Sequence, residues 1–77
     1  MKVRIISALG GNMFELDVAP GMTVGELKEE VSRRVRVPSR SIVLVHKQRQ
    51  LQDSQTLSEA GVQDYDKIYI VVRTEGG

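Results

Sequence analysis

The chain has 77 residues, a net charge of +1, 40% hydrophobic residues and no cysteine. This length allows one domain, and without cysteine neither a disulfide nor a thiolate zinc site can stabilise it, so one small aliphatic core must do so. The balanced charge disfavours nucleic acid and anionic membranes as partners, and no apolar run approaches the roughly 18 residues of a membrane-spanning helix. We therefore expect a cytoplasmic or nuclear protein.

Two alternating runs open the chain. In residues 2–8, Val3 and Ile5 fall on one face, while Ile6 falls on the other face with charged neighbours. Residues 13–18 alternate again after a glycine-rich turn signal. Alternation with a period of two is typical of strands, and glycine tolerates the positive φ of a tight turn. The pattern predicts a β-hairpin.

A helix signal follows the hairpin. Thr23 and Glu26 have the spacing of a capping box, in which each side chain accepts a hydrogen bond from the backbone of the other residue. Behind them a hydrophobic stripe recurs at helical spacing, formed by Val24, Leu27, Val31 and Val35. Pro38 pushes the residue before it into extended geometry, so the helix must end earlier. We predict one main helix over about residues 23–36.

The second half contains two further β-forming runs, at 42–46 and 67–73. Between them, Leu51 and Leu57 are expected to anchor a loop on the core. Residues 57–61 are expected to form a short helical turn that ends at a glycine. The order of the elements predicts an α+β fold, with a mixed sheet of four to five strands and the helix packed on one face.

The last two strands carry more apolar residues than one covered face requires. Alternation places a second apolar set on the face away from the core, formed by Val43, Val45, Tyr69 and Val71. One helix covers only one face of a sheet, so these side chains are expected to form an exposed patch. Exposed apolar patches mark interaction sites. Strand propensity alone would also select β-branched residues here, and we favour binding over that alternative.

The sequence lacks the residue patterns of catalysis. His46 has no serine or aspartate close by in sequence, and we interpret it as structural. The acidic pair 29–30 and the aspartates Asp64 and Asp66 lie among solvated charges, which do not raise a carboxyl pKa for acid–base work. The glycines at 10–11 are not followed by the lysine and helix of a phosphate loop. We predict no enzymatic activity, no catalytic residue, no metal and no cofactor.

A basic cluster is formed by Arg33, Arg34, Arg36 and Arg40. Such a cluster suits contact with an acidic partner. Nucleic acid is the less favoured alternative, because no aromatic residue lies among these arginines to stack on bases.

Several segments together resemble one known family. They are Thr23-Val24 with Leu27-Lys28, Val37-Pro38 after the helix, Leu51-Gln52-Asp53 followed by Thr56-Leu57-Ser58, and the last strand leading into Arg73 and Gly76-Gly77. In order and spacing the whole chain resembles ubiquitin and its relatives, the β-grasp ubiquitin-like family, with about one extra residue near the first turn. A narrower similarity, to the first domain of the interferon-induced tandem ubiquitin-like modifiers, rests on ALGGNMF, GMTVGELK and LQDSQTLS.

The resemblance implies a β-grasp domain over residues 1–73 and a flexible tail over 74–77. It also implies that the outward apolar patch binds partner proteins. In this family the patch centres on an isoleucine, whose place Val45 takes, and it includes a mobile loop leucine, to which Ala8 or Leu9 corresponds. Val43 departs from the family, because it stands where ubiquitin has an arginine, and alternation alone adds it to the patch. The predicted patch comprises Ala8, Leu9, Val43, Val45, Tyr69 and Val71.

The terminal glycines have a chemical role in this family. An activating enzyme adenylates the terminal carboxylate, a cysteine of that enzyme takes the acyl group as a thioester, and the acyl group then passes to a target amine. By resemblance, Gly77 carries that carbonyl, Gly76 gives clearance in a narrow channel, and Arg73 contacts the activating enzyme. Glu75 stands where ubiquitin has an arginine, and this charge reversal opposes use of the tail by ubiquitin's own enzymes.

Two hypotheses follow, each for a monomer with protein partners. The first is a modifier that activating and conjugating enzymes join to targets through Gly77, which the chain's start at Met1 and its diglycine end favour. The second is a binding domain that is never conjugated, such as one domain of a tandem modifier, which Glu75 favours. Arg49 and Asp64 stand where ubiquitin has the two lysines that most often link its polymeric chains, and neither residue can accept an isopeptide bond.

Overall fold

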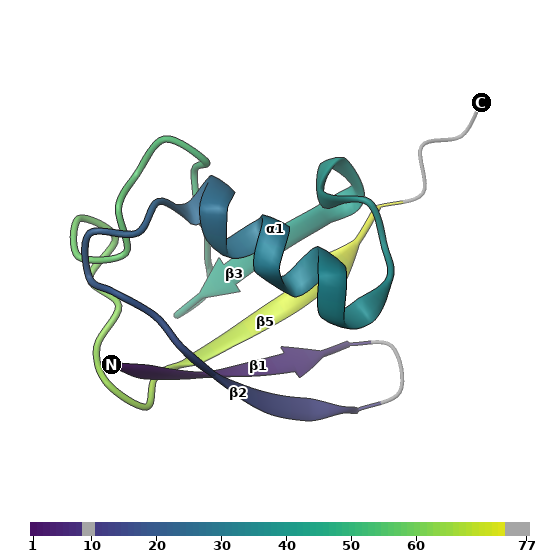
Figure 1. The fold of residues 1–77 in the computed structure, drawn as a ribbon, viewed down its shortest axis with the longest axis horizontal. Helices are drawn as coiled ribbons and strands as arrows, with labels where there is room; N and C mark the ends of the chain where they lie inside the picture. The colour runs from purple at the N-terminus through teal and green to yellow at the C-terminus, as the bar shows by residue number, and fades with distance from the viewer. Residues whose placement is uncertain (9–10, 74–77) are drawn as a thin grey trace.

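The computed structural model describes residues 1–8 and 11–73. A sheet and one α-helix make up most of this part of the chain (Figure 1). In chain order the elements are β1 (Lys2–Ser7), β2 (Met13–Asp17), α1 (Val24–Val35), the 3₁₀ helix η1 (Ser39–Ser41), β3 (Ile42–His46), β4 (Arg49–Gln50) and β5 (Lys67–Val72). Neither helix has the length and apolar character needed to cross a membrane.

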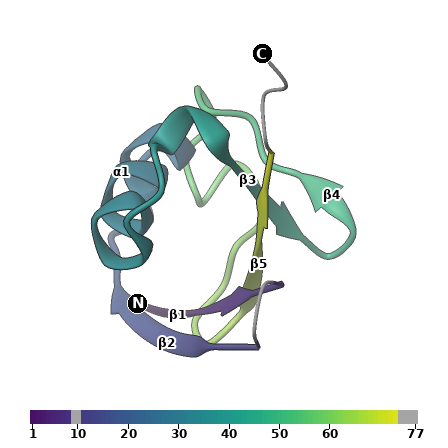
Figure 2. The same ribbon diagram turned by 90° about the vertical axis from the view of Figure 1, so that its right-hand side faces the viewer.

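The five strands form one mixed sheet in the order β2-β1-β5-β3-β4. Strand β1 runs antiparallel to β2 and parallel to β5, whereas β3 runs antiparallel to both β5 and β4. Figure 2 shows that the sheet curls around α1, so that its concave face is covered by the helix and its convex face points outward. The predicted α+β fold, with one helix on one face of a mixed sheet, is confirmed.

Capping interactions define both ends of α1. The Thr23 hydroxyl accepts from the Glu26 backbone N–H at 3.1 Å, and the Glu26 carboxylate accepts from the Thr23 N–H at 3.0 Å. At the other end Arg36 takes a left-handed conformation with φ of 59° and donates its N–H to the Ser32 carbonyl. The predicted capping box is therefore confirmed, and the helix keeps its predicted limits.

The core fills the space between α1 and the concave face of the sheet. Its most deeply buried members are Val3, Ile5, Val24, Leu27, Val31, Ile42, Leu44, Leu57, Ile68 and Ile70. The strands alternate as predicted, because successive side chains of a strand point to opposite faces. Leu51 and Leu57 are both buried, which confirms them as anchors of the long loop before β5.

Residues 57–61 form hydrogen-bonded turns, in agreement with the predicted short helical turn: the Ala60 N–H donates to the Thr56 carbonyl four residues earlier at 3.0 Å, and Gly61 follows with a left-handed φ of 80°. One local feature differs from the sequence prediction. The polar stretch after β3 was expected to be a turn, and it contains the short strand β4 as well. Lys47 and Gln48 take left-handed φ values of 51° and 68°, so the chain reverses within two residues and β4 pairs with β3.

Candidate functional site

The convex face of the sheet brings together the four apolar residues that alternation turns outward. In the β3–β5 ladder Val43 is paired with Val71, and Val45 is paired with Tyr69. Tyr69 is 43% exposed and Val71 is 42% exposed, while the two β3 valines are half-buried. Directly opposed side chains on one sheet face have Cβ atoms about 5 Å apart, so the four form one continuous surface.

Two residues that the sequence prediction left out extend this surface across the sheet. Ile6 is paired with Tyr69 on one side and with Met13 on the other. Ile6 is half-buried, and Met13 is 58% exposed. The result is an apolar row, Met13, Ile6, Tyr69 and Val45, that crosses four adjacent strands. We call Ile6, Met13, Val43, Val45, Tyr69 and Val71 together the outer patch.

The remaining predicted site residues divide into two groups. Ala8 is exposed, and its N–H donates to the Ile70 carbonyl at 3.2 Å, which places it next to β5 at the margin of the outer patch. Arg73 is exposed, and its N–H donates to the Ser41 carbonyl at 2.7 Å. Leu9, Gly76, Gly77 and the rest of the predicted tail 74–77 lie outside the described residues.

Charges of one sign surround the outer patch on the β3–β5 side. Residues 41–52 and 67–73 contain no aspartate or glutamate. Their basic residues are all exposed, and they are Lys47, Arg49, Lys67 and Arg73. Lys67 shares the outward face of β5 with Tyr69, and Lys47 lies beside both, whereas Arg49 is paired with the buried His46 and points to the other face of the sheet. On its β3–β5 side the outer patch therefore has a basic rim, which complements a partner surface with an apolar centre and acidic edges.

His46 has an aspartate partner that sequence proximity does not indicate. The imidazole is only 4% exposed, and its Nε2 lies 2.8 Å from the Asp66 Oδ2. The same carboxylate oxygen accepts from the Gln63 N–H at 2.9 Å. The Gln63 backbone amide first, and then His46, holds the pKa of Asp66 below its usual value. The expectation that Asp66 is a solvated charge is wrong, because folding brings its carboxylate into contact with His46 at the end of β3.

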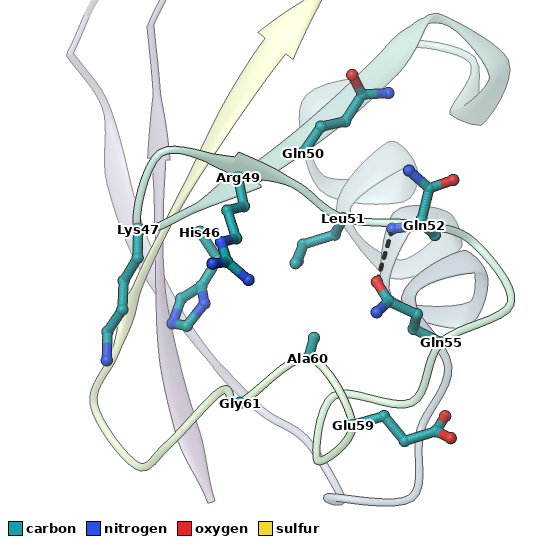
Figure 3. Close-up of a pocket in the computed structure, with 10 residues that line it drawn as sticks. All are labelled: His46, Lys47, Arg49, Gln50, Leu51, Gln52, Gln55, Glu59, Ala60 and Gly61. Atoms are coloured by element: carbon teal, nitrogen blue, oxygen red, sulfur yellow. Dashed lines mark hydrogen bonds between the residues drawn. The ribbon is translucent and has the colours of Figure 1, made fainter.

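A polar hollow of about 510 Å³ lies beside His46, between the β3–β4 turn and the loop before β5 (Figure 3). Two of the side chains that line it, Glu59 and Gln55, hold the loop. The Glu59 carboxylate accepts from the Thr56 N–H at 2.8 Å, and this amide lowers the pKa of Glu59. Figure 3 shows the Gln55 carboxamide bonded to the Gln52 N–H, at 3.1 Å. Within residues 1–8 and 11–73, the structure contains no group of three or more His, Asp or Glu side chains that could hold a metal ion.

A five-stranded sheet curled around one capped helix, with an apolar convex face, defines a ubiquitin-like β-grasp domain. The chain belongs to the ubiquitin family, since the model of that family matches residues 2–75. A solved ubiquitin structure from Caldiarchaeum subterraneum superimposes with a TM-score of 0.90 at 41% identity, covering 100% of this chain and 98% of that one.

Longer proteins also contain a similar segment. The chain is 31% identical over 77 residues to the midnolin homolog of Drosophila melanogaster, covering 100% of this chain. It is 31% identical over 71 residues to ubiquilin of Dictyostelium discoideum and 33% identical over 73 residues to ubiquilin-4 of Mus musculus, covering 92% and 95% of this chain. It spans only 7%, 13% and 12% of the lengths of these three relatives.

Proposed function

We propose that this ubiquitin-like domain is a recognition module and that its outer patch binds partner proteins. The observation that carries the proposal is the pairing of Val45 with Tyr69 and of Val43 with Val71 on the uncovered face of the sheet. The much greater length of the ubiquilin and midnolin relatives supports a role as one domain among others. The narrower likeness to the interferon-induced tandem modifiers stays a prediction, as does location in the cytoplasm or nucleus.

The size of the surface sets the expected affinity. Covering about 300 Å² of apolar surface yields on the order of 7 kcal/mol. Association consumes several kcal/mol of this through lost motion and ordered side chains. The few kcal/mol that remain correspond to a dissociation constant in roughly the millimolar range from apolar burial alone, which suits a weak, reversible receptor contact. The basic rim, with Lys47 and Lys67, favours partners that carry acids beside their apolar residues.

The proposal is tested by affinity measurements with a panel of purified ubiquitin-binding domains. Val45→Asp puts a charge in the centre of the outer patch and should abolish binding, with little loss of folding stability because Val45 is half-buried. Ala19→Asp is the control, since it adds the same charge at an exposed residue that does not belong to the outer patch. Unchanged binding by Val45→Asp would contradict the proposal.

A second candidate function is conjugation through the Gly77 carboxylate. Its support is the 41% identity to a ubiquitin over nearly the whole length of both chains, together with the Gly76-Gly77 sequence. Incubation with ATP, magnesium and candidate activating enzymes should then give a thioester that deletion of Gly77 removes. Glu75→Arg should increase thioester formation by ubiquitin's own activating enzyme, because it restores the charge that this enzyme's site expects. If no activating enzyme forms a thioester, conjugation is refuted.

A further inference from the structure

A second hollow lies at the end of the fold where α1 and β5 finish and β2 begins, the end that faces the viewer in Figure 2. Its volume is about 380 Å³. Phe14, Val35, Val37 and Val72 form apolar walls as half-buried side chains, and Ser7 and Asn12 add polar groups. We call this hollow the end pocket. It opens between the sheet and the helix, whereas the outer patch lies on the convex face of the sheet.

The end pocket is bordered by a one-sided charge. Residues 31–37, at the end of α1, contain three arginines and no acid. Arg33 is neutralised by Glu30, whose carboxylate lies 2.6 Å from its guanidinium. Arg34 lines the pocket with its guanidinium 5.4 Å from the centre of the Phe14 ring. Arg34 has no carboxylate partner among residues 1–8 and 11–73.

The helix dipole does not account for this charge. The C-terminus of a helix carries only about half a negative charge, which one last-turn arginine already balances. Arg33, Arg34 and Arg36 all lie at this end of α1, whereas Arg40 of η1 lines a different hollow together with Glu29 and Asp53. The excess positive charge beside an apolar pocket complements a ligand that is apolar at one point and acidic next to it.

We propose that the end pocket binds a short acidic segment of a partner protein. An apolar side chain of that segment enters between Phe14 and Val35, and a neighbouring carboxylate pairs with Arg34. A polypeptide fits better than a nucleic acid, because single-stranded nucleic acids bind to exposed aromatic rings and the Phe14 ring is half-buried beneath Arg34. This assigns a role to Arg34, a member of the basic cluster that the outer patch leaves unexplained.

A labelled peptide with the sequence Asp-Glu-Val-Ile-Asp-Asp tests the proposal by fluorescence anisotropy. Arg34→Ala should weaken its binding about tenfold, the usual effect of losing one charge-assisted hydrogen bond. The matched control Arg33→Ala removes the same charge from the same turn and should change the affinity far less. Val35→Thr keeps the side-chain shape but adds a hydroxyl to the pocket wall and should weaken binding severalfold.

Further measurements test the proposal. A peptide with serines in place of valine and isoleucine should bind poorly, and Val45→Asp should leave the binding of the original peptide intact. The proposal is overturned if the peptide does not bind, if the serine peptide or a short oligothymidylate binds equally well, or if the two arginine variants lose the same affinity. Loss of binding in Val45→Asp would also overturn it, since the peptide would then lie on the outer patch. Failure of the outer-patch proposal leaves these results unaffected.

Discussion

Replacement of Asp66 by alanine should destabilise the domain far more than its position in a polar loop suggests. The carboxylate joins the buried His46 ring at 2.8 Å to the Gln63 N–H at 2.9 Å. In Asp66→Ala both groups lose their partner. The Gln63 amide is in an exposed residue, so water replaces its bond, whereas the His46 Nε2 remains inside with its ring only 4% exposed.

The expected cost follows from that unsatisfied nitrogen. A buried polar group without a partner costs about 1–3 kcal/mol, and we expect a loss of about 2 kcal/mol in the free energy of unfolding. For a domain of this size that corresponds to a fall in Tm of about 10 °C. Asp66→Asn keeps the shape and an acceptor oxygen and should lose about half as much. Asp17→Ala breaks an exposed ion pair with Lys2 at 3.3 Å and should leave the stability unchanged within error.

Thermal and urea unfolding followed by circular dichroism measure these differences, and pH provides a second check. The pKa of Asp66 is lowered in the folded protein, so its stabilisation is fully present above the unfolded pKa and is lost as the pH falls through the folded value. The difference in unfolding free energy between the wild type and Asp66→Ala should therefore become smaller below about pH 4. A Tm for Asp66→Ala equal to that of the wild type at neutral pH would refute a stabilising role for the pair.

Three other substitutions test the local structure by the same unfolding measurements. Gln48→Gly should stabilise the domain by about 0.5–1 kcal/mol, because glycine relieves the left-handed φ of 68° in the two-residue turn before β4; a loss of stability would contradict that turn. Thr23→Ala removes the side chain that caps α1 and should cost about 1 kcal/mol, and no loss would mean that the cap contributes nothing. Leu57→Ala opens a cavity at a fully buried position and should cost about 2–5 kcal/mol, so a loss below 1 kcal/mol would place Leu57 outside the core.

Much of the fold can be predicted from short stretches of sequence. The Thr23 and Glu26 pair and the valine–leucine stripe behind it specify where α1 begins and which face it buries. Alternation assigns Tyr69 and Val71 to the outward face of β5, because the side-chain period of a strand is fixed at two. These signals depend only on neighbours in the chain, which is why a single sequence contains them.

The remainder depends on which strands become neighbours. Alternation turns Ile6 outward, yet only the parallel pairing of β1 with β5 brings it beside Tyr69 and completes the outer patch. The contact between His46 and Asp66 spans 20 positions and depends on the turn at 63–66. The end pocket is likewise lined by residues from three elements, Phe14 of β2, Val35 of α1 and Val72 of β5. Periodicity contains no information about such pairings.

The role of the outer patch is tested most directly by NMR, with the ¹⁵N-labelled domain titrated with a ubiquitin-binding domain. We predict that the amide resonances that shift lie on the convex face, at Ile6, Val43, Val45, Tyr69 and Val71. The same titration of Val45→Asp should leave these resonances in place, while its spectrum remains that of a folded protein. Shifts confined to α1 or to the loop before β5, or equal shifts in Val45→Asp, would contradict binding through the outer patch.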